Sequence, residues 1–493
     1  MISYWIKSTD IKESTYIPKY YDPEIIESIT RLRPSHYLFS IGDLVNNQII
    51  TLTTGDEIGK SAYGTGDIPF VRTSDIANWE IKTAPKQGVS KEIYDEYSLS
   101  QNVNEGDILL VRDGTYLIGH NCFITAIDKE IIFQSHILKI RINKPEIFPP
   151  ELFFLALNSP LAQKQIRSIQ FTADIIDTLG QRINEVILPL PKDEKICNEL
   201  KIEVLNALKT RTIGKAFIKH LPIIIETVLE TNSPKPISDF LALPLSQLAS
   251  VVTNRTVTAE FGEFETTWLP SSEIINNIYL PKYYDPKIQE ELDRLTSTCE
   301  IKSMGQLRNE NKISYYTGVE IGKMAYDTGD IPFIRTSDFS NWEILYDPKQ
   351  GISEQIYNEY AESLDVQEND ILLVRDGTYL IGTSCIVTKG NVKSLFCGGL
   401  YKIRVNQDKD IDPFLFLGLL NSFIVKRQIR TKQFTRDVID TIGNRIDEIY
   451  IPIPKEKKIR DAISNAVKAI IFSRIQSRDD ISRLSTLISM ASN

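Results

Sequence analysis

The segment DILLVRDGTYLIG, at residues 107–119, recurs without a change at residues 370–382. Its surroundings recur too, since GDIPFVRTSD at residues 66–75 returns as GDIPFIRTSD 263 residues later. Three further segments recur with few changes at the same offset: IPKYYDP (17–23), QFTADIIDTLGQRI (170–183) and ILPLPK (187–192). No insertion or deletion is needed between residues 17 and 192. Solenoid units have only 20–50 residues, so this repeat is a whole domain present twice.

Each copy predicts the same order of elements. Short segments rich in Val, Ile, Leu and Phe, bounded by Gly, Asp and Asn, predict β-strands at residues 68–72, 108–112 and 137–142 of the first copy. A short helix is predicted next, at residues 150–167 and 413–430, followed by a Pro-bounded strand and a second helix. Residues 231–266 have no counterpart before the first copy. They open with a Pro-rich linker, and residues 245–257 are a candidate for an additional strand.

The second helix of each copy carries an apolar stripe. Apolar residues recur every fourth position and therefore share one helix face. They are Ile196, Leu200, Val204 and Leu208 after the first copy, and Ile459, Ile463, Val467 and Ile471 after the second. We favour the interpretation that these helices pack on each other and hold the two domains at a fixed separation. The alternative is that each helix packs only on its own domain.

Composition narrows the class of protein. The chain of 493 residues is 42% apolar and 25% charged, which is typical of a globular protein. Its formal charge of −9 excludes non-specific coating of nucleic acid through bulk charge. Five scattered cysteines exclude a disulfide scaffold and show no zinc-type spacing. We see neither a signal peptide nor an apolar run long enough to span a membrane, and we predict a cytoplasmic protein.

Sequence motifs typical of enzymes are incomplete or absent in this chain. GDEIGKS at residues 55–61 is one residue short of a phosphate-binding loop, and its second copy places Met324 where a hydroxyl is required. The loops of an adenine methyltransferase are absent, and no His is shared by both copies. Three Asp residues are shared and could be metal ligands of a nuclease: Asp75, Asp107 and Asp113, with Asp338, Asp370 and Asp376. The leading hypothesis is that the chain is not itself an enzyme, and the metal-dependent nuclease is an alternative.

Polar residues are duplicated at the ends of predicted strands. Arg can bond guanine or phosphate, Ser, Thr and Tyr can bond phosphate oxygens, and Gly allows close approach of the backbone. The candidate DNA-binding residues are Lys60, Arg72, Thr73, Ser74, Arg112, Thr115, Tyr116, Lys323, Arg335, Thr336, Ser337, Arg375, Thr378 and Tyr379. The alternative role is structural, with Arg72 paired to Asp75, and Arg112 to Asp113 or Asp107.

Two windows differ strongly between the copies. They are residues 36–53 against 299–316, and residues 120–136 against 383–399. Residues that read bases should differ if the two halves of a target differ, so these windows are the better candidates for sequence readout.

The ordered, duplicated set of motifs resembles the DNA-specificity subunit of type I restriction-modification systems. The resemblance implies an α+β fold with two homologous mixed α/β target recognition domains. Each domain would be followed by a long helix, and the helices would pair as an antiparallel coiled coil with pseudo-two-fold symmetry. The implied boundaries are 1–191 and 257–454 for the recognition domains, 192–230 and 455–493 for the spacer helices, and 231–256 for a linker.

The resemblance also implies the partners. Each domain would read one half of a bipartite double-stranded DNA target, and the chain would bind modification subunits and, through them, restriction subunits. It would hold no cofactor of its own, because S-adenosylmethionine would belong to the partner methyltransferase. Besides the nuclease, a protein-interaction scaffold that never meets DNA remains an alternative.

Overall fold

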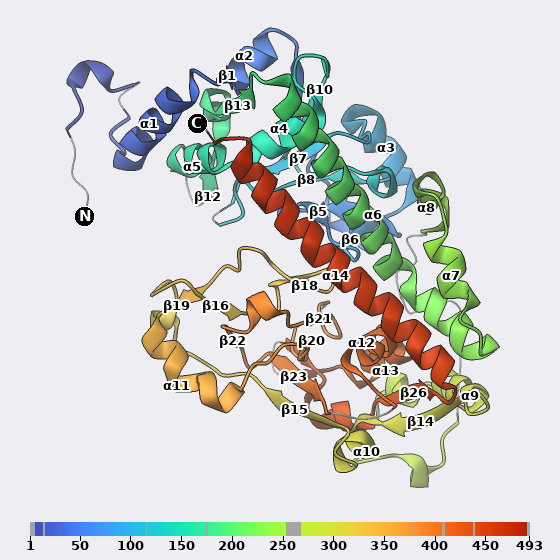
Figure 1. The fold of residues 1–493 in the computed structure, drawn as a ribbon. Helices are drawn as coiled ribbons and strands as arrows, with labels where there is room; N and C mark the ends of the chain where they lie inside the picture. Colours follow the sequence, from blue (N-terminus) through green and yellow to red (C-terminus); the bar gives the residue numbers. More distant parts are fainter. Residues whose placement is uncertain are drawn as a thin grey trace. The chain divides into compact units, whose positions relative to one another are not determined.

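The computed structural model describes residues 5–12, 15–114, 116–173, 176–252, 268–377, 379–406, 410–436 and 439–490. The chain forms two compact units (Figure 1). Unit 1 comprises Met1–Ile213 and Ser473–Asn493, and unit 2 comprises Gly214–Phe472. Each unit holds one copy of the repeat. Within the described part of the chain, every helix is too short or too polar to cross a lipid bilayer.

Unit 1 is built around a four-stranded antiparallel sheet. Its strand order is β2 (Ile50–Thr54), β10 (Ile137–Ile142), β7 (Ile108–Val111) and β8 (Asn121–Phe123). All four residues of β7 are buried, which explains why its sequence is continuously apolar instead of alternating. A second sheet has the order β6 (Gln87–Val89), β3 (Ile68–Val71) and β9 (Ile132–Phe133), with β3 and β9 parallel.

Among the described residues, three strand pairs and five α-helices complete the recognition part of unit 1, together with short 3-10 helices. The pairs are β1 (His36–Ser40) with β13 (Ile187–Pro191), β4 (Ile76–Ala77) with β5 (Glu80–Ile81), and β11 (Phe171–Ala173) with β12 (Ile176–Thr178). The helices are α1 (Pro23–Leu32), α2 (Ile41–Asn46), α3 (Lys91–Gln101), α4 (Pro150–Leu157) and α5 (Pro160–Ser168). Pairing β1 with β13 joins the beginning of the domain to its end.

Unit 2 repeats this arrangement. Its four-stranded sheet is β15 (Ile313–Thr317), β23 (Leu400–Val405), β20 (Ile371–Val374) and β21 (Ser384–Ile386), and its three-stranded sheet is β19 (Gly351–Ile352), β16 (Ile331–Ile334) and β22 (Leu395–Phe396). The pairs are β14 (Cys299–Ser303) with β26 (Tyr450–Pro454), β17 (Phe339–Ser340) with β18 (Glu343–Ile344), and β24 (Phe434–Arg436) with β25 (Ile439–Thr441). The helices are α9 (Pro286–Leu295), α10 (Met304–Asn309), α11 (Glu354–Leu364), α12 (Pro413–Leu420) and α13 (Phe423–Lys432). Even the register is shared, since His36 faces Pro191 as Cys299 faces Pro454.

The helix predicted at residues 150–167 is two helices, which corrects the sequence prediction. α4 ends at Leu157 and α5 begins at Pro160. The Ser159 hydroxyl accepts the N–H of Ala162 at 3.2 Å, as an N-cap does, and Pro160 occupies the first helical position. In unit 2, α12 and α13 are divided at the same place. In unit 1, the N-cap at Ser159 therefore divides the helix.

Two long helices follow the copies, as predicted. They are α6 (Glu194–Thr231) and α14 (Lys457–Leu487), and they contact each other (Figure 1). In unit 1, Glu203 of α6 pairs with Arg483 at 2.5 Å, and Arg211 reaches the carbonyl of Arg474 at 3.4 Å. Partner numbers fall along α14 as they rise along α6, so the helices are antiparallel.

The apolar stripes serve both roles that the sequence left open. Leu200, Val204 and Leu208 lie in a core with Ile481 and Leu484 of α14, which confirms the helix pairing. The same core includes strands and helices of the recognition part of unit 1. In unit 2, Ile463 and Val467 pack against Gly418 of α12, and Ile459 and Ile471 are buried as well. Ile196 is only partly buried at the edge of its core. Each helix therefore packs on a domain and on the other helix.

The segment after α6 is helical, which corrects the expectation of an additional strand. α7 (Lys235–Leu241) and α8 (Leu245–Val251) occupy it, and residues 253–257 of the expected strand lie outside the described residues. Phe240 of α7 packs edge-on against Phe217 of α6, with ring centroids 5.9 Å apart. The apolar positions that looked like strand alternation are used to pack short helices.

Candidate nucleic-acid interface

The RTSD turn, residues 72–75 and 335–338, follows β3 and β16. Asp75 is buried, and its carboxylate accepts the backbone N–H of Arg72 at 2.9 Å and of Lys86 at 3.3 Å. Asp338 accepts the N–H of Arg335 at 2.8 Å in the same way. Burial raises the pKa of Asp75, although these hydrogen bonds oppose the shift. The aspartate thus shapes the turn through backbone N–H groups.

The other residues of the RTSD turn are half-buried at the surface. They are Arg72, Thr73 and Ser74, with Arg335, Thr336 and Ser337 in unit 2. The Nε atoms of Arg72 and Arg335 are both buried, and neither has a hydrogen-bond partner among the described residues. A buried N–H without an acceptor costs free energy.

The RDG turn, residues 112–114 and 375–377, follows β7 and β20. Arg112 Nε lies 3.0 Å from the Asp113 carboxylate, and Arg375 Nε lies 3.1 Å from that of Asp376. The structural role considered for Arg112 is therefore present for its pair with Asp113. Burial alone would raise the pKa of Asp113, but hydrogen bonds with Thr178, His136 and Arg112 lower it. This carboxylate is held ionised as the hub of the turn.

Glycine is required in the RDG turn. Gly114 has φ +126° and Gly377 has φ +135°, a region that L side chains rarely adopt. Their N–H groups donate to the carbonyls of Asp177 and Asp440, each at 2.9 Å. These bonds tie the RDG turn to the β11–β12 hairpin and to β24–β25. The predicted Thr115 and Thr378 lie outside the described residues.

Tyr116 and Tyr379 are half-buried beside the RDG turn. Their carbonyl groups accept hydrogen bonds from Arg167 and Arg430 respectively, both at 3.2 Å. The tyrosine backbone is therefore fixed in the same way in both units.

The structure brings the two turns together in each unit. Gln134 donates its N–H to Val71 at the end of β3, at 2.9 Å, while Arg112 donates its N–H to the His136 carbonyl at 3.0 Å. Residues 134–136 thus lie between the turns. In unit 2, a Cβ atom on Gly399 would lie 2.9 Å from Thr336 and 3.8 Å from Asp376. Arg72, Thr73, Ser74 and Arg112 therefore form one local surface.

The predicted Lys60 and Lys323 stand apart from this surface. Both are exposed at the start of short 3-10 helices, Lys60–Ala62 and Lys323–Ala325. Among the described residues, neither makes a hydrogen bond or ion pair to the RTSD or RDG turn. The structure therefore places them near the sheets but does not join them to the other candidates.

One divergent window lies at the joined turns. It ends in Gln134, Ser135 and His136, and its counterpart ends in Cys397, Gly398 and Gly399. His136 contacts Asp113 at 3.0 Å and approaches Glu57 at 3.8 Å. The other window, residues 36–53, forms β1, α2 and most of β2, not a loop, and much of it is buried in the core. The first window is therefore the one that can vary a surface next to an invariant frame.

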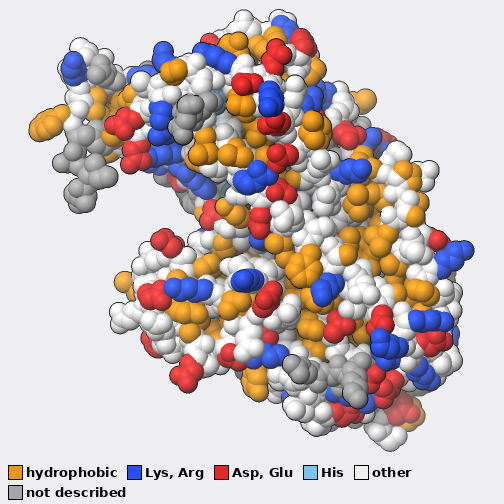
Figure 2. Space-filling model, in the orientation of Figure 1, with side chains coloured by type: hydrophobic (Ala, Val, Ile, Leu, Met, Phe, Trp, Pro, Cys, Tyr) orange, Lys and Arg blue, Asp and Glu red, His pale blue; other side chains and the backbone are white. Residues whose placement is uncertain are grey.

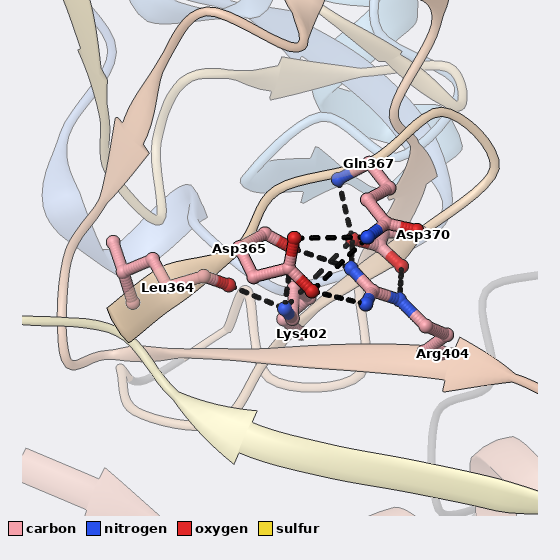
Figure 3. A network of polar contacts seen from close by, with 6 residues as sticks. All are labelled: Leu364, Asp365, Gln367, Asp370, Lys402 and Arg404. Atoms are coloured by element: carbon pink, nitrogen blue, oxygen red, sulfur yellow. Dashed lines mark hydrogen bonds and ion pairs between the residues drawn. The ribbon is translucent and has the colours of Figure 1, made fainter. Parts of the chain in front are cut away.

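The duplicated aspartates do not form a metal centre in the described residues. Asp107 is bound by Arg141, at 2.6 Å, and Asp370 is bound by Arg404, at 2.7 Å (Figure 3). Lys402 adds hydrogen bonds to the carbonyls of Leu364 and Asp365 at the end of α11. No group of three His, Cys, Asp or Glu side chains in the described part of the chain could hold a metal ion. Each aspartate is engaged by the fold instead.

A second duplicated cluster lies beside the RDG turn, and the sequence had shown it only as two separate repeats. The hydroxyl of Tyr20 donates to Glu185, and the guanidinium of Arg182 lies 4.3 Å from the centre of the Phe171 ring. The same contacts recur in unit 2 between Tyr283 and Glu448 and between Arg445 and Phe434. Figure 2 shows Lys and Arg side chains beside acidic ones where Figure 1 places α5 and β12. Identity at the common offset was the available signal, but residues about 150 apart gave no hint of contact.

Comparison with known proteins places the fold and the turns in context. Residues 298–483 match the family model described as "Type I restriction modification DNA specificity domain". Among curated proteins there is no significant match. The matched segment includes the RTSD and RDG turns of unit 2 and most of α14.

Solved structures give distant matches over nearly the whole chain. A type I restriction-modification S subunit from M. genitalium is 11% identical with a TM-score of 0.34, over 92% of this chain and 94% of that one. The HsdS subunit from Thermoanaerobacter tengcongensis is 14% identical with a TM-score of 0.27, over 93% and 96%. These similarities are too low to establish function. However, residues 298–455 of the matched segment repeat residues 35–192 at the offset of 263. The C-terminal half of the chain therefore carries the type I restriction-modification DNA specificity domain, and residues 35–192 repeat the sequence of most of it.

Proposed function

We propose that the chain reads a bipartite double-stranded DNA sequence for a type I restriction-modification complex. The recognition domains are residues 1–191 and 257–454, each reading one half-site. Residues 192–230 and 455–493 are the spacer helices, and residues 231–256 link the halves. The chain supplies recognition, while methylation and its S-adenosylmethionine belong to modification subunits, through which restriction subunits join. Its DNA targets place it in the cytoplasm.

One observation carries this proposal. In both units, polar turns whose sequence is identical in the two copies border an edge whose sequence differs between them. These polar turns are the joined RTSD and RDG turns, fixed by aspartates of which Asp75, Asp113 and Asp338 are buried and Asp376 is half-buried. The edge is residues 134–136 in unit 1 and residues 397–399 in unit 2. Contacts to phosphate position a protein on DNA, whereas contacts to bases specify the sequence. We assign phosphate contacts to Arg72, Arg112 and their counterparts, and readout to the variable edge.

The charge of −9 is compatible with this role. Arginines at the turns, with buried or partly paired guanidinium groups, give local positive charge even though the chain as a whole is acidic. Binding should therefore depend on the assembled complex, whose other subunits add charge. We expect the isolated chain to bind DNA weakly at physiological salt.

Selection from random DNA tests the proposal. The chain, purified with its methyltransferase subunits, should enrich a sequence of two fixed parts separated by a fixed gap. Arg112→Ala should weaken binding to all sequences about equally and reduce the slope of log affinity against log salt by about one. Lys195→Ala, an exposed change on α6, is the control.

Two outcomes would contradict the proposal. Failure to enrich any sequence would remove the reading function, and unchanged affinity and salt dependence in Arg112→Ala and Arg375→Ala would remove these turns from the interface. Retained assembly without any DNA binding would favour a protein scaffold.

A further inference from the structure

Unit 1 contains a buried Arg–Glu–Arg cluster, formed by Glu80 of β5, Arg211 of α6 and Arg474 of α14. Their exposed fractions are 6%, 3% and 0%. Glu80 Oε1 lies 3.2 Å from Arg211 Nη2 and 2.5 Å from Arg474 Nη2, and its Oε2 lies 3.4 Å from Arg474 Nη1. One carboxylate of the recognition domain therefore binds both long helices.

The two arginines are counterparts in the repeat. They are 263 residues apart, and each donates to the main-chain carbonyl of the other, at 3.4 and 3.5 Å. The helix sequences around them have diverged, since TRTI surrounds Arg211 where SRIQ surrounds Arg474. The helices thus meet at the same position of each copy, and these two arginines mark that position.

Arg474 occupies a place in an apolar seam. Five buried residues of α14 lie at intervals of three and four, namely Ile470, Arg474, Ser477, Ile481 and Leu484, and their neighbours Ile471 and Ser485 are buried as well. This is the pattern of core positions in a coiled coil. A polar residue at such a position lowers stability but fixes the register and the partner, because any shift would leave it unpaired in an apolar environment.

Glu80 is also tied to the RTSD turn. β5 pairs with β4, which directly follows the turn, so that Ala77 faces Glu80. The N–H of Lys82 donates to the carbonyl of Asp75 at 2.9 Å. The carboxylate that holds the helices is therefore rigidly connected to a turn of the candidate interface.

We propose that the buried Arg–Glu–Arg cluster fixes the register of α6 against α14 and thereby sets the distance between the two half-sites. The inference rests on the proposed function, because it needs a target in two parts. A slip of one helix turn would move Arg474 away from both Glu80 and Arg211, whereas apolar seam residues alone would tolerate it. Glu80, Arg211 and Arg474 are thus positioning residues for spacing, not contacts to bases.

The test measures spacing preference in the full chain with its methyltransferase subunits. DNA duplexes carry the two selected half-sites with gaps from several base pairs shorter to several longer. The variant combines Glu80→Leu, Arg211→Leu and Arg474→Leu, which replaces the cluster by apolar side chains. The control combines Glu203→Ala and Arg483→Ala, an ion pair between the same helices whose side chains are about half exposed.

We expect the apolar variant to fold and to bind each half-site, but its preference for the native gap over neighbouring gaps should fall about tenfold, or ~1.4 kcal/mol. The control should keep the native preference. An unchanged gap preference in the folded apolar variant would overturn the inference. So would failure of that variant to fold, because a cluster kept for register must be replaceable by apolar residues. Absence of any two-part target for the unmodified chain would instead refute the proposed function.

Discussion

At the scale of single residues, buried charges in this protein are held by specific partners. Asp370 is 1% exposed and is bound by Arg404 through both carboxylate oxygens, at 2.7 and 2.8 Å (Figure 3). Lys402 approaches the same carboxylate at 3.9 Å, and burial lowers its pKa. Asp107 and Arg141 repeat the pair in unit 1.

Asp370→Ala should destabilise unit 2 by about 3 kcal/mol, because two cations would lose their buried counter-charge. Asp461→Ala removes an exposed partner of Lys457 and should cost less than about 1 kcal/mol. Urea unfolding of both variants measures the difference. Equal, small losses would mean that the network in Figure 3 contributes little.

His36 makes the stability of unit 1 depend on pH. It is 3% exposed, and burial, assisted by the nearby charge of Lys192, lowers its pKa below 6.5. Below pH 6.5 the unfolded chain therefore takes up a proton that the folded chain resists, and stability falls as the pH falls. Well above pH 6.5 the imidazole is neutral in both states, and this dependence disappears.

The second copy supplies the matched substitution, because Cys299 occupies the equivalent register position and is 2% exposed. We expect His36→Cys to lose less stability than the unmodified chain between pH 7.5 and pH 5.5. Thermal unfolding midpoints across this range measure it. Parallel pH curves for the two proteins would contradict the assignment to His36.

At the scale of elements, the long helices are stabilised through their buried seam. Leu484 of α14 is fully buried in the core with Val204 of α6, whereas Leu487, three residues later, is 39% exposed. Leu484→Ala should cost roughly 2–5 kcal/mol, because it leaves a cavity where the helix meets the core.

Leu487→Ala is the control and should cost less than about 1 kcal/mol. Denaturant unfolding compares the two, with hydrogen exchange of α6 amides as a second readout. If Leu484→Ala left α6 as protected as before, the packing of α14 on α6 would be unimportant for stability.

The elements also show where sequence reasoning reached its limit. The strands β3, β7 and β10 were predicted because each is a short apolar run bounded by turn residues. The division of α4 from α5 was missed, since a Ser N-cap at residue 159 acts through local geometry that helical periodicity does not report. α8 was taken for a strand because a seven-residue helix has too few turns to show its period.

At the scale of the whole molecule, duplication separates scaffold from specificity. A chain with Gln134→Cys, Ser135→Gly and His136→Gly would present the edge of unit 2 on unit 1. We expect the DNA target of this variant to change from two different half-sites to two similar half-sites. The reason is that the surrounding turns are identical in both units. Selection from random DNA measures the target.

The control is Lys91→Glu, which also introduces the residue of the second copy, Glu354, but on the exposed surface of α3. It should leave the target unchanged. A target that stays the same in the triple variant would place readout elsewhere than at residues 134–136.

The sequence by itself determined the duplication, the strands around the RDG turn, the apolar stripes and the family resemblance. These depend on local composition and on identity at one offset, which a single chain displays. Only the tertiary structure decided that the RTSD and RDG turns form one surface, and that Asp107 pairs with Arg141 and Asp370 with Arg404. It alone joined Glu80 to Arg211 and Arg474. The physical reason is that pairing between side chains distant in sequence depends on how strands and helices pack, and no local pattern records those contacts.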